Sequence, residues 1–499
     1  MTASTAIRGT VDAHVEAHVD TEDGVVRTSD QRSRWFVEHR PFLMALILGV
    51  AIRAVVMLAF TPALMVSDGP RYLRILDTFS PAQDRVVGYS LLVLHPVSLF
   101  TENLLAVATV QHLMGLATAV LLYVLLRRWG ATRWPATLAT LPVLFDAMQL
   151  VLEHAPLSDA PFVLLVTAGI AALGWRRRPT LALTLVAGLL LGASVTVRQV
   201  GLPLLLTGAA FCLLVGTQWR ARLATGLVFT IGFLVPIGAY AAWYHSEHDT
   251  YALSEVGGRS AYMRTTTFVD CSGLSIPQYQ RVLCPPEPRG ARQDPSIYGW
   301  SDPRTVWSLE PPPGTTREDA MRNFAREAIR EQPADYAMVV ARDFALNFDV
   351  GRGDRFEFDG SWKWRFSSFV DLEPDTWTGP AFEAHGGQQL SSQQPYADAL
   401  VAYQRVGYLP GPLLLGCLAL GLVGAFGWGR ARHSGSRPMC LLLTLSGLAL
   451  IVVPAVTTQF IWRYQLPALV LLPGSAALAF TALRDRHRVA GTVATPRTD

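Results

Sequence analysis

Ten apolar stretches, each close to the length that crosses a bilayer, constrain the fold of this chain more than any other feature of its sequence. A membrane-spanning helix needs about 20 mostly apolar residues. Only 16% of the 499 residues are charged, whereas roughly 25% is usual for a soluble domain. The sequence therefore predicts an α-helical polytopic membrane protein with about ten transmembrane helices. They are expected near 41–64, 103–126, 134–151, 159–174, 180–197, 200–217, 223–244, 409–428, 439–457 and 464–483, and 134–151 with 159–174 also fits one hairpin.

Arginine is distributed unevenly between the two sides of these predicted helices. One side carries Arg32, Arg34, Arg40, Arg127, Arg128, Arg133, Arg176, Arg177, Arg178, Arg220, Arg222, Arg430, Arg432, Arg484, Arg486 and Arg488. The short loop 153–158 on the other side has no lysine or arginine. Because cytoplasmic loops are enriched in basic residues, we expect a plasma-membrane protein with both termini in the cytoplasm. The first apolar stretch lacks a small-residue cleavage site and is expected to remain as an anchor.

The apolar stretches also predict the domain organisation. We expect a disordered cytoplasmic tail at 1–40, an N-terminal transmembrane module at 41–244 with its first outer loop at 65–102, an extracytoplasmic domain at 245–408, three C-terminal helices at 409–483 and a cytoplasmic tail at 484–499. The net charge of +3 is too small, and the basic runs too short, to indicate nucleic-acid binding.

The outer segment 245–408 carries signals for both helix and strand. Apolar spacing predicts a helix over Thr316–Glu331, and Pro333 opens a second one that runs to about Phe348. After these, aromatic residues nearly alternate, which is typical of a half-buried strand or hairpin; they are Phe356, Phe358, Trp362, Trp364, Phe366 and Phe369. We therefore expect a smaller mixed α/β segment in which these aromatics form the core, with a sugar-stacking platform as the alternative. In the first outer loop, the amphipathic run Val86–Phe100 is expected along the interface.

Two of the five cysteines lie in the outer segment. An extracytoplasmic location is oxidising, so Cys271 and Cys284 are expected to form a structural disulfide. Cys212, Cys417 and Cys440 fall in predicted spans, where a free cysteine behaves as a small apolar residue.

Charged residues near the outer ends of the predicted helices are the candidates for chemistry, because charges at the membrane are costly and tend to be functional. Asp68 lies in the sequence Ser-Asp-Gly-Pro-Arg-Tyr just after the first span. The other members are Asp146, Glu153, His154 and Asp159 at the second outer turn, Arg198 and Arg463-Tyr464 at helix ends, and Arg53, Gln111 and His112 within spans. All of them can face one outward cavity.

This set fits sugar transfer from a polyprenyl-phosphate donor. Such a reaction needs one carboxylate to accept the proton of the incoming hydroxyl and arginines to neutralise the departing phosphate. We assign Asp68 as the general base and predict a substrate-binding set of Arg71, Tyr72, Glu153, His154, Asp159, Arg198, Arg463 and Tyr464. In this set, Arg198 and Arg463 are the phosphate clamps.

Each assignment has a structural alternative. Asp68 suits a simple turn, and the arginines can snorkel or pair with Asp146 or Glu153. Gln111-His112 also suits an interhelical hydrogen-bond pair. No cofactor is assigned: a divalent metal is possible, but the spacing of the acids and His154 matches no compact metal motif.

With these residues in view, the chain resembles the GT-C glycosyltransferases, in particular the branch of protein O-mannosyltransferases and lipid A aminoarabinose transferases. The similarity lies in the aspartate loop followed by Gly88–Leu92, in Gln111-His112 with Leu122–Arg128, in Glu153–Asp159, and in Arg463-Tyr464-Gln465-Leu466-Pro467. Gly258-Arg259, Tyr262, Arg264, Phe268 and Cys271 are similar to actinobacterial members. The resemblance implies an inverting transfer from an isoprenoid-phosphate sugar with Asp68 as base.

The sequence departs from that family in one respect and leaves two alternatives open. Many members have paired acids in the first loop, whereas Asp68 is followed by Gly69, so Glu153 or Asp159 supplies the second carboxylate or one carboxylate suffices. A transporter or flippase of lipid-linked sugars is the alternative, although no internal repeat is visible; an inert assembly protein is another. The acceptor is a protein, a glycolipid or a wall polysaccharide.

Overall fold

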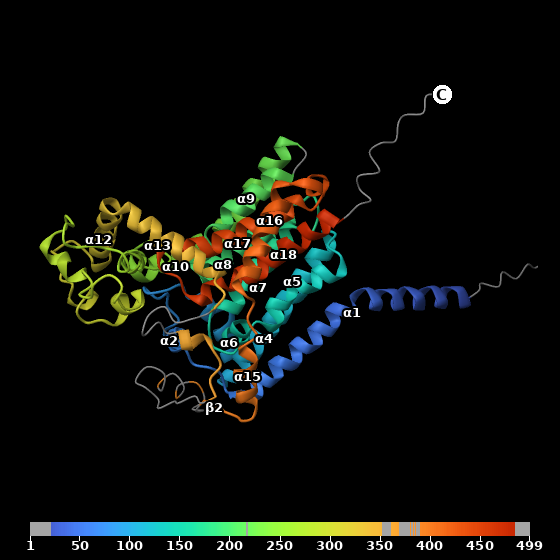
Figure 1. The fold of residues 1–499 in the computed structure, drawn as a ribbon, viewed down its shortest axis with the longest axis horizontal. Coiled ribbons are helices and arrows are strands. Elements are labelled where there is room, and N and C mark those ends of the chain that lie inside the picture. The colour runs from blue at the N-terminus through green and yellow to red at the C-terminus, as the bar shows by residue number, and fades with distance from the viewer. Residues whose placement is uncertain are drawn as a thin grey trace, which may run out of the picture.

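A computed structural model describes residues 21–215, 218–351, 361–368 and 390–484, together with positions 380, 383 and 385. It is mostly helical (Figure 1). The apolar helices are α1 (Thr21–Ala59), α4 (Leu104–Arg128), α5 (Arg133–Phe145), α6 (Ala147–Glu153), α7 (Asp159–Leu173), α8 (Leu181–Val197), α9 (Leu204–Val215), α10 (Trp219–His248), α16 (Gly411–Phe426), α17 (Arg437–Thr457) and α18 (Leu466–Arg484). The other helices are α2 (Gly69–Thr78), α3 (His95–Ser98), α11 (Gly257–Thr265), α12 (Arg317–Glu331), α13 (Pro333–Ala345) and α15 (Tyr396–Gln404). Two short strands, β1 (Phe60–Thr61) and β2 (Ser391–Ser392), pair antiparallel.

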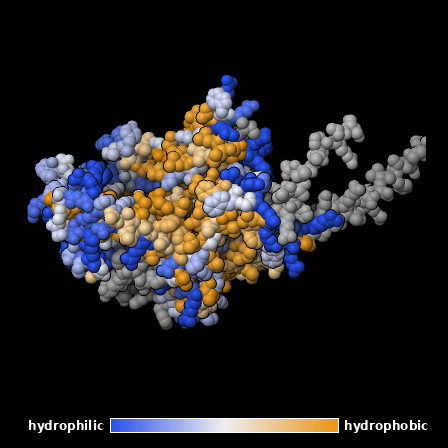
Figure 2. Space-filling model, turned by 45° about the horizontal axis from the view of Figure 1, so that its top comes forward, coloured by the Kyte–Doolittle hydropathy of each residue, from blue (hydrophilic) through white to orange (hydrophobic). Residues whose placement is uncertain are grey.

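The apolar helices make this a multi-pass membrane protein, but ten spans are not shown. In the described part of the chain, five helices are long and apolar enough to cross a membrane, or six if α5 and α6 form one span bent by 53°. Pro142 and the Asp146 cap mark that bend. The other predicted spans coincide with apolar helices of only 10–17 residues: α7, α8, Gln199–Val215 and α16. Figure 2 shows hydrophobic surface gathered over the middle of the molecule, with hydrophilic surface on both flanks.

Close helix packing in the membrane part depends on small residues. Gly188 and Gly192 lie one turn apart on α8, and a Cβ atom at either position would collide with backbone atoms of α10 near Phe233. Small residues at this spacing allow two helices in a bilayer to approach closely. This contact fixes α8 and therefore the position of Arg198 at its end.

Helix α1 begins at Thr21, so residues 21–40 of the predicted disordered tail are helical. A helix that has been nucleated gains one hydrogen bond for each residue added, which favours its extension. Residues 1–20 and the predicted tail after Arg484 lie outside the described residues. The sequence also gave no indication of α2, whose first turn contains Pro70.

The outer segment contains the two predicted helices. Thr316 caps α12 by accepting a hydrogen bond from the backbone N–H of Asp319 (3.0 Å). α13 begins at Pro333 as predicted and ends at Ala345, and the turn Leu346–Phe348 follows it. These helices lie to one side of the apolar helices (Figure 1). α12 shares a buried core with α11 that includes Tyr262, Val269, Leu283, Tyr298, Met321 and Phe324.

The strand predicted from alternating aromatic residues is wrong where the structure describes it. Ser361–Trp364 is a 3-10 turn, and Phe356, Phe358 and Phe369 lie outside the described residues. Trp364 and Phe366 are buried, but they belong to the large core of the apolar helices, where the Phe366 ring stacks on Phe60 at 5.7 Å. For Phe366, packing against Phe60 of β1 thus replaces the predicted local core. The strand content described for this segment is the two residues of β2.

The disulfide Cys271–Cys284 is present, as predicted, and closes a loop with a sequence separation of 13. Replacing both cysteines by serine should lower the free energy of unfolding of the outer segment by about 3 kcal/mol, because the unfolded chain regains its loop entropy. Chemical unfolding followed by tryptophan fluorescence would measure this change. If the double serine variant unfolds at the same midpoint as wild type, and if reducing wild type does not lower its midpoint either, the prediction is wrong.

Candidate active site

A large cavity lies where the outer segment meets the ends of the apolar helices. Its volume is about 1220 Å³, somewhat above the range of roughly 300–1,000 Å³ that is usual for ligand sites. Its walls come from the first outer loop, from α11 and α12, and from the residues just before α18. Asp68, Arg71, Tyr72, Arg463 and Tyr464, all predicted site residues, line it.

Asp68 is placed in the cavity by a sharp turn of the backbone. The preceding residue, Ser67, has a φ of 53°, in the left-handed region that non-glycine residues rarely adopt. Asp68 directly precedes α2, yet its side chain does not cap that helix. About a third of the side-chain surface is exposed. The carboxylate is thus free to contact other elements, which a simple turn aspartate has no need to do.

Two arginines hold the Asp68 carboxylate. Arg85 Nη1 donates to Oδ1 at 2.8 Å, and Arg463 Nη1 donates to Oδ2 at 2.9 Å. Burial opposes ionisation of this carboxyl group, but the charges of Arg85 and Arg463 outweigh burial and hold the pKa of Asp68 well below its usual range. Asp68 is therefore ionised at neutral pH, and it contacts two arginines whose guanidinium groups can bind a phosphate.

Arg463 also joins Asp68 to Asp159. Its Nε donates to Asp159 Oδ2 at 2.8 Å, and Arg198 Nη1 donates to Asp159 Oδ1 at 2.7 Å. The Arg198 guanidinium also lies over the ring of Tyr464 at 5.6 Å. The structure thus brings together five predicted residues from distant parts of the chain: Asp68, Asp159, Arg198, Arg463 and Tyr464. The partner of both arginines is Asp159, whereas the sequence suggested Asp146 or Glu153.

The remaining residues of the first loop complete this wall. Arg71 makes a bidentate contact to Asp84, with nitrogen–oxygen distances of 2.9 and 3.1 Å. Tyr72 donates to Ser158 Oγ at 3.1 Å, and Arg85 lies over its ring. Asp84 and Arg85 were missed by sequence reasoning. The available signal was an adjacent acid–arginine pair in the loop that carries Asp68.

Glu153 and His154, predicted to bind substrate, lie in a separate closed cluster and do not line the cavity. Both side chains are fully buried. The Glu153 carboxylate accepts from Arg53 at 2.8 Å, from His112 at 2.8 Å and from Gln149 at 2.7 Å. The carboxylate is thereby paired with neighbouring side chains on both of its oxygens.

That cluster instead fixes the chain leading to Asp68. His154 Nε2 donates to the Phe60 carbonyl at 2.6 Å, and the His154 carbonyl accepts from the Leu64 N–H at 3.0 Å. Gln111 adds bonds to the carbonyls of Glu153 and Ala155. Asp146 is also structural, since it caps α6 and accepts from the Leu409 N–H.

The opposite wall of the cavity belongs to the outer segment. Arg259 lies over the rings of Trp300 (4.4 Å) and Trp307 (5.7 Å) and contacts Glu318. Burial raises the pKa of Glu318 despite this arginine. Half of the Trp307 surface is exposed. This wall therefore offers indole faces, a carboxylate and a guanidinium to a bound molecule.

No group of three or more His, Cys, Asp or Glu side chains able to hold a metal ion occurs in the described ranges. Among the described residues, the positively charged side chains that line the cavity are six arginines and Lys363. The acids nearest to them are already used as their partners.

No protein-family model matches this sequence, and no curated protein matches it either. Among solved structures, the archaeal oligosaccharyltransferase AglB from Archaeoglobus fulgidus, in complex with an inhibitory peptide and a dolichol-phosphate, is similar with a TM-score of 0.39 and 12% identity, covering 89% of this chain and 50% of its own. ArnT from Cupriavidus metallidurans, bound to undecaprenyl phosphate, is similar with a TM-score of 0.32 and 13% identity. The match covers 88% of this chain and 77% of the ArnT chain.

The protein O-mannosyltransferase Pmt1–Pmt2 complex of S. cerevisiae, bound to the sugar donor, gives a TM-score of 0.33 and 15% identity over 48% of this chain. This chain spans 37% of the length of that protein and half the length of AglB. All three similarities are distant, with TM-scores between 0.32 and 0.39 and identities between 12% and 15%. They extend to no individual residue or activity.

Proposed function

We propose that this protein is a membrane glycosyltransferase that moves a sugar from a polyprenyl-phosphate donor to an acceptor hydroxyl on the extracytoplasmic face, with inversion at the sugar carbon. The observation that carries the proposal is the contact between the ionised Asp68 carboxylate and Arg463 in a large cavity at the ends of apolar helices. A base and a phosphate ligand are the two groups that this reaction requires.

The position of the cavity supports a lipid-linked donor. Asp159 begins α7, Arg198 follows α8, and Arg463 immediately precedes α18. These residues therefore lie at one end of the apolar helices, where the phosphate of a lipid can meet the arginines while its isoprenoid chain stays between helices. A nucleotide donor would need no such arrangement.

The proposed reaction is a single displacement. The acceptor hydroxyl oxygen attacks the sugar C1 on the face opposite the phosphate, and Asp68 takes the hydroxyl proton. The bond between C1 and the phosphate oxygen breaks, and its electron pair leaves with the polyprenyl phosphate. Arg463, with Arg85 or Arg198, stabilises the negative charge that develops on that phosphate.

Binding of the donor phosphate would also make Asp68 a better base. Free Asp68 shares the charges of Arg85 and Arg463, which lower its pKa. A phosphate that takes hydrogen bonds from these arginines would reduce their hold on the carboxylate and raise its proton affinity. The acceptor would then approach from the wall formed by Trp300, Trp307 and Glu318.

Sugar transfer by the purified protein in lipid tests this function. Radiolabelled polyprenyl-phosphate sugars, including mannose and arabinose donors, would be supplied with a membrane extract as acceptor. We expect label to appear in the acceptor and free polyprenyl phosphate to be released in equal amount. Movement of intact donor across sealed vesicles without transfer would instead support a transporter.

The pH dependence of transfer offers a second test. Asp68 must be ionised to act as base, and its lowered pKa should keep kcat/KM constant as the pH falls through the usual range of a carboxyl group. Arg85→Gln removes one of the two charges that lower this pKa, so the acid limb should move to higher pH. Asp68 stays ionised at neutral pH in both proteins, so a change of rate there would report the loss of Arg85 as a phosphate ligand. Profiles of both proteins from pH 3.5 to 8 would check this, and superimposable acid limbs would contradict it.

A further inference from the structure

A second polar cavity lies at the opposite end of the apolar helices from Asp68. Its volume is about 500 Å³, and its lining consists of the end of α4 (Arg128, Trp129) and the residues after α7 (Gly174–Arg177). Helix α7 connects the two regions, since Asp159 at its start binds Arg463 and Gly174 follows its end. Its 15 residues rise by about 22 Å, so the two cavities lie near opposite ends of the layer of apolar helices.

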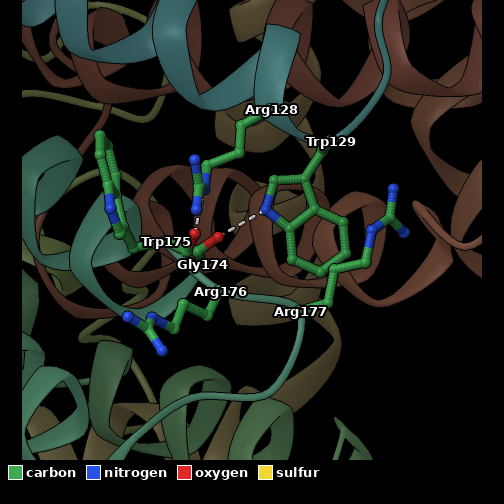
Figure 3. A pocket seen from close by; sticks show the side chains of 6 residues that line it. All are labelled: Arg128, Trp129, Gly174, Trp175, Arg176 and Arg177. Carbon is green, nitrogen blue, oxygen red and sulfur yellow. Dashed lines mark hydrogen bonds between the residues drawn. The ribbon is translucent and has the colours of Figure 1, made fainter. Parts of the chain in front are cut away.

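This cavity is built from arginines held against indole rings. Figure 3 shows the Arg128 guanidinium between the rings of Trp175 and Trp129, with Arg177 against the other side of Trp129. The guanidinium carbons lie 4.9 Å from the Trp175 ring for Arg128 and 5.2 Å from the Trp129 ring for Arg177. The Trp129 N–H donates to the Gly174 carbonyl at 2.7 Å, which joins the two helix ends.

The arginines retain donors for a further ligand. Arg128 donates to the Trp175 carbonyl, and Arg177 donates to the Gly435 carbonyl. A guanidinium has five N–H groups, so each contact leaves several available. Within the described part of the chain, Arg176 makes no hydrogen bond or ion pair, and no carboxylate lines this cavity.

A neighbouring cavity at the same end provides a contrast. It has a volume of about 440 Å³ and is lined by Glu38, Arg127 and Arg133. There Glu38 neutralises Arg127 through an ion pair of 2.5 Å. The cavity of Arg128, Arg176 and Arg177 therefore differs in having three arginines and no carboxylate, whereas its neighbour has two arginines and one carboxylate.

We propose that the cavity of Arg128, Arg176 and Arg177 binds the phosphate of an anionic phospholipid from the leaflet opposite the Asp68 cavity. Basic pockets between membrane helices bind lipid head groups, and tryptophan side chains sit preferentially at the level of those head groups. The Trp175 ring, 37% exposed, would contact the glycerol and upper acyl region while the arginines bind the phosphate. This proposal is independent of the glycosyltransferase function.

The test compares lipid binding by wild type and Arg176→Gln/Arg177→Gln in nanodiscs of phosphatidylcholine with increasing phosphatidylglycerol. Native mass spectrometry would count the phosphatidylglycerol retained, and the thermal midpoint would report its stabilising effect. Each arginine near the surface changes the affinity for an anionic lipid about fivefold. In the double variant the fraction of phosphatidylglycerol needed for half-saturation should therefore rise about 25-fold, and the mass spectrum should show one bound lipid fewer. Arg176→Lys/Arg177→Lys keeps the charge and should largely retain binding.

The matched control is Arg220→Gln/Arg430→Gln. These two exposed arginines lie at the same end of the helices but line neither of these cavities, so removing them should shift half-saturation less than twofold. Equal losses in both double variants would overturn the proposal, because the arginines would then act only as general positive charge. If inorganic phosphate in pure phosphatidylcholine discs raises the thermal midpoint as much as phosphatidylglycerol does, the assignment to a lipid is wrong.

Discussion

Replacing Asp68 by asparagine should lower the rate of sugar transfer by about 10²–10⁴-fold, the usual contribution of a positioned general base. The asparagine amide has nearly the same shape but cannot take the hydroxyl proton. It also removes one carboxylate partner from Arg85 and from Arg463, which then keep only Asp84 and Asp159. The donor phosphate should therefore bind as well as in wild type or more tightly, so kcat should fall while KM for the donor stays equal or decreases.

This division between kcat and KM separates loss of the base from loss of folding. The matched control is Glu102→Gln, which removes an exposed carboxylate from the same outer loop but away from the cavity, and it should transfer sugar at the wild-type rate. Asp68→Asn protein with full activity would reject the base assignment. Asp159, which shares Arg463 with Asp68, would then be the next candidate.

Arg53→Met should produce the largest loss of stability among single substitutions in the membrane part. Arg53 donates two hydrogen bonds of 2.8 Å to the fully buried Glu153. Removing one partner of a buried ion pair leaves the other charge uncompensated, at a cost of about 3–5 kcal/mol. Denaturant unfolding in a lipid–detergent mixture would measure the loss.

The second half of this experiment is a double variant. Arg53→Met/Glu153→Gln keeps a hydrogen-bonding amide at position 153 but removes its charge, so it should recover much of the stability lost by the single variant. If the two substitutions simply add, the uncompensated charge is not the cause. Because His154 beside this cluster holds Phe60 and Leu64, the single variant should also displace the Asp68 loop and reduce transfer.

The sequence predicted the features that depend on local pattern. Apolar runs placed the helices, and Thr316 and Pro333 marked the starts of α12 and α13. The cysteine pair was also predicted from its outer location. The number of spans was not, because α7, α8, α9 and α16 are apolar without having the length that a span requires.

The candidate site was predictable in its charged members but not in their pairing. Asp68, Asp159, Arg198 and Arg463 were identified because each is a charge beside an apolar run. Their separations in the sequence reach 395 residues, as for Asp68 and Arg463, and no local pattern encodes which of them meet. Glu153, like Asp159, is a charged residue beside an apolar run. Its carboxylate, however, is buried among the helices in an ion pair with Arg53.

The pairing of β1 with β2 links the end of the outer segment to the chain that leads to Asp68. Phe60 and Thr61 pair with Ser392 and Ser391, at the end of the outer segment just before α15. Only six residues separate Thr61 from Asp68, a tether of at most about 25 Å even when fully extended. Under the proposed function, an acceptor that displaces the outer segment would therefore also displace the loop that carries Asp68.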